Sequence, residues 1–193
     1  MIRNLLLAAL GGAIAACAAA PEPSASLQAL ASLDVPDYMG TWYQVAWFPN
    51  RFQKQCLSDT AATYRQLDRG QVAVVNRCRR ADGSIDEVEG LARPQGSTIR
   101  GNRLEPAQLE LSFLPAVLRW LPISGSYWVI QLAEDGRYAV VSEARREYLW
   151  VLSRTPALLP ADQTAIRSRL VQQGFDPSRW QPHPHASPVA APR

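Results

Sequence analysis

The chain has 193 residues, of which 47% are hydrophobic and 19% are charged, and its formal net charge is +3. This length favours a single domain with a sizeable core and additional segments at its ends. The net charge is too small to indicate nucleic acid as a partner.

The N-terminus predicts an exported protein. Arg3 precedes an apolar run from Leu5 to Ile14, which is too short to span a membrane and leads through small residues to Cys17. This ending resembles the lipobox of bacterial lipoproteins. The resemblance implies that residues 1–17 are a signal peptide ending at Cys17, and that Cys17 carries acyl chains, palmitate among them, that anchor the protein.

Ala18, which follows the predicted anchor, implies by the same resemblance sorting to the outer membrane of a Gram-negative bacterium, facing the periplasm. A plain secretory signal that happens to hold a cysteine is the alternative. The remaining cysteines, Cys56 and Cys78, belong to a chain exported to an oxidising compartment, and they are most simply a disulfide. Two free thiols are the alternative.

Segments of biased composition flank the centre of the chain. Residues 18–33 are rich in Ala, Pro and Ser and predict a tether, in which leucines spaced by three are compatible with a short helix against the domain. Residues 181–193 are rich in proline and predict a disordered tail. Its His183 and His185 could touch a metal, but no third ligand accompanies them, so a solvated tail is preferred and no metal site is predicted.

Between these ends lie runs rich in β-branched and aromatic residues, separated by turn signals, as is typical of an all-β barrel. Tight turns are predicted at 68–70 and 135–136, where glycine supplies positive φ. A helix is predicted over 160–173, with proline at its start and Gly174 as its stop. The eight predicted strands are 42–48, 60–66, 71–78, 85–92, 108–113, 126–132, 138–142 and 148–153.

Two motifs carry a family resemblance: Gly-Thr-Trp-Tyr at 40–43, and the run Tyr-Leu-Trp-Val-Leu-Ser-Arg-Thr-Pro at 148–156. Over 36–180 the chain resembles the lipocalin family, in its Blc-type bacterial branch of outer membrane lipoproteins, and more distantly apolipoprotein D. The family's usual Thr-Asp-Tyr motif is replaced by Gly-Arg-Tyr at 136–138. The resemblance implies a domain over 34–180, an eight-stranded up-and-down antiparallel β-barrel with the C-terminal helix packed outside.

Closure of such a barrel makes the first and last strands neighbours. Trp42 is then expected to form the floor, covered by Arg154 through cation–π stacking, with both residues structural. Alternation from Trp42 predicts which side chains face the cavity, although the phase of the other strands is open and a slip by one residue inverts the set. The predicted ligand-binding candidates are Gln44, Ala46, Phe48, Tyr64, Val74, Asn76, Tyr127, Val129 and Trp150.

Four connections are expected at the open mouth, at 49–59, 79–84, 114–125 and 143–147. A Cys56–Cys78 bridge would attach the first of them to the barrel wall. These connections are also rich in arginine, which suits the carboxylate or phosphate of an amphiphile with an anionic head. Solvated loop arginines are the alternative. The predicted basic rim comprises Arg51, Arg79, Arg80, Arg119, Arg145 and Arg146, with Lys54 nearby.

These features predict a membrane-anchored lipoprotein that stores or transports fatty acids or lysophospholipids for maintenance of the outer membrane, including under stress. No catalytic set of residues is visible and no cofactor is expected, so the protein is predicted not to be an enzyme, with catalysis on the barrel a distant alternative. The apolar loop 114–123 supports another alternative, an envelope module that docks a protein partner. The same loop could serve as a lid or as a homodimer interface.

Overall fold

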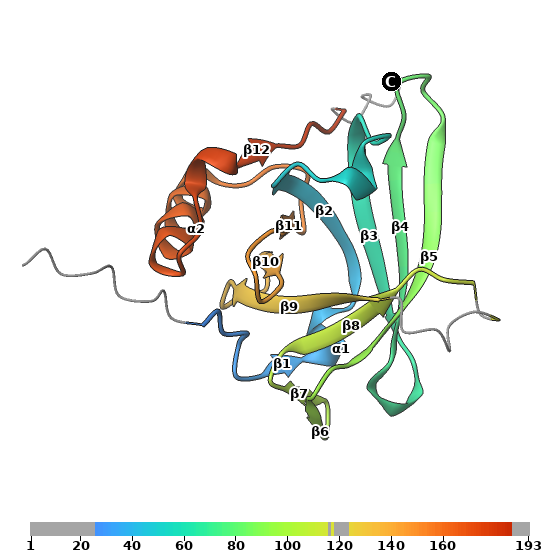
Figure 1. Ribbon diagram of the computed structural model, residues 1–193, viewed down its shortest axis with the longest axis vertical. Helices are drawn as coiled ribbons and strands as arrows, with labels where there is room; N and C mark the ends of the chain where they lie inside the picture. Colours follow the sequence, from blue (N-terminus) through green and yellow to red (C-terminus); the bar gives the residue numbers. More distant parts are fainter. Residues whose placement is uncertain (1–25, 116, 118–123, 187–193) are drawn as a thin grey trace, which may run out of the picture.

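The structure is a computed structural model that describes residues 26–115, 117 and 124–186. Its main sheet closes on itself, because the last strand pairs with the first (Figure 1). Closure joins the two outer strands of the sheet to each other, and it confirms the predicted eight-stranded antiparallel barrel. The barrel strands are β2 (Gly40–Trp47), β3 (Ser58–Gln66), β4 (Val72–Arg79), β5 (Ile85–Pro94), β8 (Gln108–Ser112), β9 (Gly125–Leu132), β10 (Tyr138–Ser142) and β11 (Leu149–Ser153).

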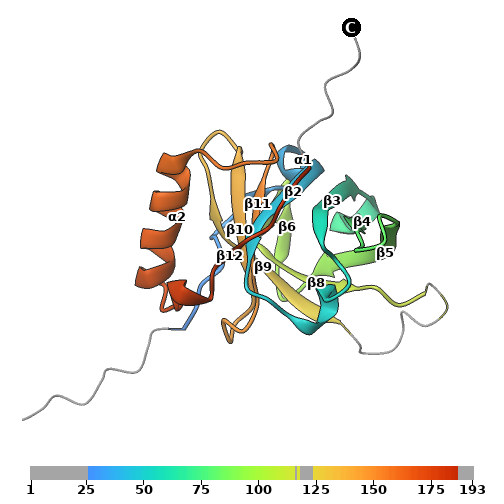
Figure 2. The ribbon, with the colours of Figure 1, turned by 90° about the horizontal axis from the view of Figure 1, so that it is seen from above.

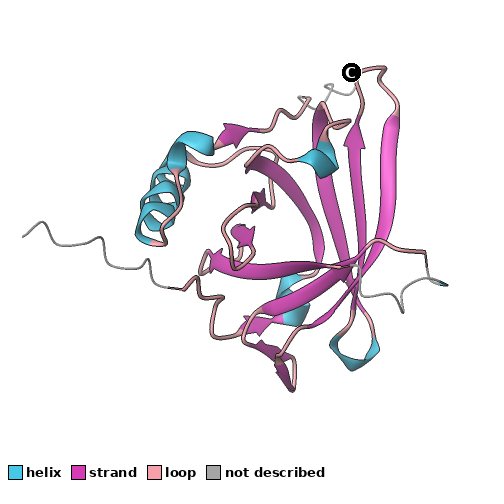
Figure 3. Ribbon diagram, viewed as in Figure 1, coloured by secondary structure: helices cyan, strands magenta, loops and turns pink. Residues whose placement is uncertain are grey.

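Shorter elements close one end of the barrel. A small three-stranded sheet lies there beside a one-turn helix, as Figure 3 shows in magenta and cyan. It consists of β1 (Leu33–Asp34), β7 (Arg103–Glu105) and β6 (Thr98–Arg100), and α1 (Val35–Tyr38) follows β1 directly. The remaining short elements are η1 (Arg51–Gln53), η2 (Asp68–Gly70), η4 (Pro177–Arg179) and β12 (Gln181–Pro182).

The helix α2 (Pro160–Gln172) lies against one side of the barrel (Figure 2). It begins with proline, whose missing N–H costs nothing in the first turn, and Gly174 follows its end at a φ of 79°. Ile166 and Leu170, one turn apart, are fully buried against the outer face of the strands. The predicted helix is therefore present and one residue shorter than expected.

The strands beneath α2 are apolar on both faces because each face meets a different core. On β10, Ala139 and Val141 belong to the core inside the barrel, whereas Tyr138 and Val140 pack in the core under the helix. This alternation is the two-residue period of an extended strand.

A β-bulge changes the phase of β2. Val151 pairs with Ala46 but its neighbour Leu152 pairs with Gln44, so Val45 is an extra residue in β2. Ala46 and Phe48 consequently join the core under α2 instead of facing the cavity. The prediction that these two residues line the cavity is wrong, because strict alternation holds only as far as Gln44.

The C-terminal residues 181–186 pack into the barrel wall, so the prediction of a disordered tail is wrong for them. β3 pairs with β2 only as far as Tyr43, and the two strands separate beyond it. In the gap, β12 pairs with β2, the backbone N–H of His183 donates to Val45, and the carbonyl of Pro184 accepts from Asp59. The tail is ordered because it supplies hydrogen bonds that the separated strands cannot give each other.

Residues 26–33, which belong to the predicted tether, also pack on the domain. Leu27 and Leu33 are buried, and the backbone N–H of Leu30 donates to Val129 while its carbonyl accepts from Ala107. No helix forms over 26–32. The leucine spacing reflects contacts of an irregular segment with the barrel instead of a helical face.

Candidate ligand-binding site

The closed end of the barrel is sealed by Trp42 and Arg154. The guanidinium carbon of Arg154 lies 3.7 Å from the centre of the Trp42 ring, and the indole N–H donates to the carbonyl of Tyr38. Arg154 also donates to the carbonyls of Thr41 and Asp37 at 3.1 and 2.8 Å. Burial lowers the pKa of Arg154. These contacts hold the arginine against the floor, so it is part of the structure that closes the barrel.

Gly40 has a specific role at this floor. Its φ is +90°, which residues with a side chain rarely adopt, and a Cβ there would lie 3.6 Å from Nη1 of Arg154. Glycine at position 40 therefore lets the backbone pass close to Arg154, two residues before Trp42 enters the barrel.

The interior of the barrel is mainly apolar. Its largest buried side chain is Trp42, and Ala139, Val141 and Leu152 lie in the same core. Seven of the predicted cavity residues lie on this inner face. Three of them belong to the inner core: Tyr64, Val74 and Val129. Tyr127 and Trp150 pack against that core. Gln44 pairs with Leu152 and Asn76 pairs with Ala62 across the sheet, and both of these partners face inward.

A cavity of about 20 Å³ lies inside the barrel, which is room for one water molecule. A larger guest therefore needs side chains of the wall to move. The cavity is lined by Leu33, Val35, Tyr38, Met39, Tyr64, Gly70, Val72, Val74, Ala92, Leu104, Leu109, Leu111 and Tyr127.

Three tyrosines form a hydrogen-bonded cluster in this cavity. The hydroxyl of Tyr127 lies 2.8 Å from that of Tyr38 and 3.0 Å from that of Tyr64. Burial raises the pKa of Tyr64 to about 12 and those of Tyr38 and Tyr127 well above their ordinary value, so all three are neutral hydroxyls. Tyr38 was missed by sequence reasoning because it precedes the first barrel strand and enters the cavity from α1.

Glutamines form a second polar group nearer the mouth. Gln53, from η1 of the first mouth loop, donates to Oε1 of Gln44 at 2.8 Å and accepts from the indole N–H of Trp150 at 2.8 Å. Gln44 is buried, and its Nε2 has no hydrogen-bond partner. A buried amide donor is thus left over on the inner face of the barrel.

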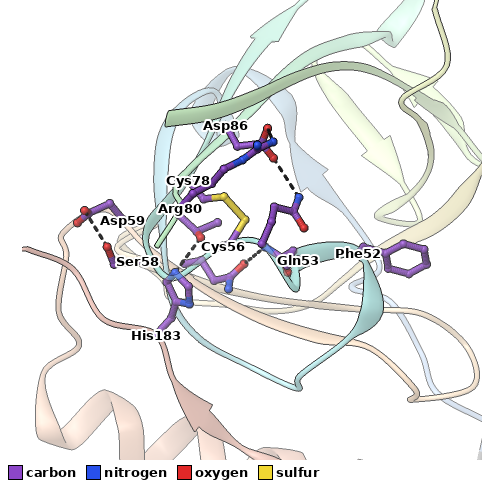
Figure 4. The surroundings of a disulfide bond; sticks show 12 residues. Phe52, Gln53, Cys56, Ser58, Asp59, Cys78, Arg80, Asp86 and His183 are labelled. Carbon is purple, nitrogen blue, oxygen red and sulfur yellow. Dashed lines mark hydrogen bonds and ion pairs between the residues drawn. A yellow bond between two sulfur atoms is a disulfide. The ribbon is translucent and has the colours of Figure 1, made fainter. Parts of the chain in front are cut away.

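The Cys56–Cys78 disulfide ties the first mouth loop to β4 (Figure 4). The two Cα atoms are 5.4 Å apart, and the bridge spans 22 positions of the sequence. The pairing predicted from export is present. The bridge also fixes the loop that carries Gln53 over the interior.

The predicted rim arginines are mostly engaged with protein groups. Arg79 lies 2.8 Å from Asp59, Arg80 pairs with Asp86, and Arg145 lies 3.3 Å from Glu147. Arg146 donates to the carbonyl of Gln173 after α2, and Arg51 stacks over Phe52. Arg119 lies outside the described residues, as do Cys17 and most of the loop 114–123. An anionic head at this rim would have to compete with existing partners.

Within residues 26–115, 117 and 124–186, no three His, Cys, Asp or Glu side chains are placed to hold a metal ion. No helix in the same ranges is long and apolar enough to cross a membrane.

Residues 33–185 match the lipocalin-like domain family, a range that includes the closed barrel and its Trp42–Arg154 floor. The chain belongs to the lipocalin family. It is 32% identical to the outer membrane lipoprotein Blc of Escherichia coli K12 over 91% of this chain and 93% of that protein.

Eukaryotic relatives are similar over most of the same region. Temperature-induced lipocalin-1 of Arabidopsis thaliana is 31% identical over 83% of each chain, and apolipoprotein D of Bos taurus is 30% identical over 75% of this chain and 73% of that protein. Among solved structures, insecticyanin from the tobacco hornworm superposes with a TM-score of 0.65 at 16% identity, covering 89% of this chain and 90% of that chain. That likeness concerns the fold.

Proposed function

We propose that this lipocalin is a membrane-anchored lipoprotein that binds one fatty acid or lysophospholipid in its barrel, for storage or transport at the outer membrane. The observation that carries the proposal is the closed barrel, whose apolar interior has one end sealed by Trp42 and Arg154. An enclosed apolar interior of eight strands suits one small apolar guest. No bond-making step is part of the proposal.

Similarity to Blc proteins of Escherichia coli and Citrobacter freundii, each an outer membrane lipoprotein by name, supports the envelope location. The sequence around Cys17 adds the means of attachment, since each buried methylene of an acyl chain contributes about 0.8 kcal/mol. Replacing the predicted signal and Cys17 by a cleavable secretory signal peptide that has no lipidation cysteine should move the protein from the membrane fraction to the soluble periplasmic fraction. Retention in the membrane fraction would refute the proposed anchor.

The proposed ligand is tested on the full chain with Cys17→Ser, purified without detergent so that no detergent fills the barrel. Native mass spectrometry and lipid extraction should find one fatty acid or lysophospholipid per chain. An empty barrel that also takes up no such lipid in titration would overturn the proposal.

A docking function is the second candidate, because Phe113 and Val117 next to the undescribed part of the mouth loop are 39% and 79% exposed. Replacing residues 114–123 with Gly and Ser separates the two candidates. Loss of an envelope partner with unchanged lipid affinity would favour docking, whereas loss of lipid affinity would place the loop at the barrel entrance.

A further inference from the structure

The tyrosine cluster is a polar feature at the depth of the barrel where an apolar chain end would lie. Tyr38 comes from α1, Tyr64 from β3 and Tyr127 from β9, so three separate elements bring the hydroxyls together. The rings of Tyr38 and Tyr64 stack 5.7 Å apart, and the Tyr127 ring meets Tyr64 edge-on at 6.2 Å. Tyr38 also packs 5.0 Å from the floor residue Trp42.

The cluster holds one more proton than its internal contacts use. Three hydroxyls carry three O–H donors, and the two contacts at Tyr127 use two of them. One O–H donor remains, together with unused lone pairs on the oxygens. A buried donor in an apolar site favours any small polar group that can pair with it.

The cavity beside the hydroxyls has the size of such a group. At about 20 Å³ it accommodates one water molecule or one hydroxyl. Apolar side chains make up most of the remaining wall, including Val72, Leu109 and Leu111. Met39 lies in the same wall, and its flexible thioether side chain can move aside for an entering chain.

The lack of a direct cationic partner at the cluster favours a neutral group over an anion, although the charge of Arg154 acts to lower the pKa of Tyr38 and Tyr64. The neighbouring cation, Arg154, is held over Trp42 and donates to two backbone carbonyls. A carboxylate or phosphate buried at the cluster would therefore lack a free cationic partner, and burial of an unpaired charge is costly. A hydroxyl meets no such penalty, because it donates and accepts like the tyrosines themselves.

We propose that the Tyr38–Tyr127–Tyr64 hydroxyl cluster is a subsite for a neutral hydroxyl group on the buried end of a bound amphiphile. The inference rests on the proposed lipid-binding function and narrows its ligand class to acyl chains hydroxylated near the end remote from the head. Hydroxylated chains then bind more tightly than unsubstituted chains of the same length.

The test compares omega-hydroxypalmitic acid with palmitic acid by isothermal titration of the full chain with Cys17→Ser. The hydroxylated acid should bind about fivefold to tenfold more tightly, as one net hydrogen bond allows. Tyr127→Phe removes the hydroxyl shared by both contacts and should abolish this preference while palmitate still binds. Tyr43→Phe is the matched control, because Tyr43 packs with the core under α2 and should keep the preference.

The outcomes separate this inference from the proposed function. Equal affinity of the two acids in the parent protein, or a preference that survives in Tyr127→Phe, overturns the subsite while lipid binding stands. Absence of binding by both acids overturns fatty-acid binding and the subsite together. Should Tyr127→Phe fail to fold, Tyr64→Phe takes its place, with the same loss of preference expected.

Discussion

Arg154 joins the two ends of the barrel sheet by contacts from a single side chain. It stacks on Trp42 and donates to the carbonyls of Asp37 and Thr41. Replacement by alanine should lower the free energy of unfolding by about 2–3 kcal/mol, because it removes a close cation–π contact and two hydrogen bonds to backbone carbonyls. Urea unfolding measures the loss, and Arg65→Ala, on an exposed position of β3, should change stability by less than about 0.5 kcal/mol. Equal effects of the two substitutions would contradict this role.

His183 makes stability depend on pH. Nε2 of its buried ring lies 2.7 Å from Oγ1 of Thr60. Burial is the main cause, and the nearby His185 the second, of a decrease in the pKa of His183 from 6.5 to about 4. Between about pH 4 and 6.5 the unfolded chain therefore binds a proton that the folded chain does not. Stability is fully present above pH 6.5 and falls as the pH drops through this window, by on the order of 3 kcal/mol.

Urea unfolding at pH 7 and pH 4.5 measures this dependence. His183→Gln keeps a hydrogen-bonding side chain that does not titrate, so the variant should lose less stability between the two pH values than the parent. Asp59 and His185 lie near His183 and are present in both proteins, so the comparison isolates the change at position 183. A parent and variant with the same pH dependence would refute the assignment.

The bulge in β2 marks the limit of residue-level prediction. Alternation from Trp42 is correct at Gln44, but the extra residue Val45 reverses the phase for Ala46 and Phe48. The Gly-x-Trp motif indicates where β2 begins, because Gly40 and Trp42 are both needed for the floor beneath Arg154. Nothing local in the sequence marks the bulge, because Val, Ala, Trp and Phe suit either face of a strand covered on both sides.

The C-terminal segment acts as an element of the wall. A chain ending after Trp180 should lose about 3 kcal/mol of stability compared with a chain ending after Ala186, because backbone groups of Val45 and Asp59 lose their partners and the His183–Thr60 contact is removed. The chain ending after Ala186 is the matched control and should unfold like the full chain. Thermal unfolding distinguishes them, and identical midpoints would show that the segment adds nothing to the wall.

The disulfide should stabilise the domain through its unfolded state. Closing a loop over a separation of 22 residues is worth about 3 kcal/mol, so Cys56→Ala combined with Cys78→Ala should lose roughly that amount. Denaturant titration of the parent with and without reductant gives an independent measure. The loss should be the same by both routes, and a double variant as stable as the oxidised parent would contradict it.

Elements with strong periodicity were predictable, and those that depend on distant partners were not. The eight barrel strands and α2 follow from alternation, turn glycines and helix signals. Residues 181–186 carry no such pattern, and the leucine spacing within 26–33 suggests a helix that does not form. The order of both segments comes from hydrogen bonds to Ala107, Val129 and Val45, far away in the sequence. Composition alone cannot reveal such partners, which is why both segments were predicted to lie outside the domain.

At the scale of the whole molecule, the barrel has two cores with separate tasks. The core under α2 holds the helix to the strands, while the inner core surrounds the cavity with its tyrosine cluster. The apolar character of the interior is predictable, because the strand pattern places apolar side chains on the inner face. The small volume of the cavity is not predictable, because it depends on how side chains from α1 and from strands far apart in the sequence interlock.

The most direct test of the account is whether a lipid binds inside the barrel. Ala92 lines the cavity, and the ring of Ala92→Phe is larger than the cavity, so it would displace side chains of the wall and occupy the space that a lipid needs, whereas Val171→Phe adds the same ring to an exposed position of α2. Native mass spectrometry with lysophospholipid or palmitate should show one lipid per chain for the parent and for Val171→Phe, and at least tenfold weaker binding for Ala92→Phe, with circular dichroism confirming the fold of each. Equal binding by all three proteins would place the lipid elsewhere and contradict the account.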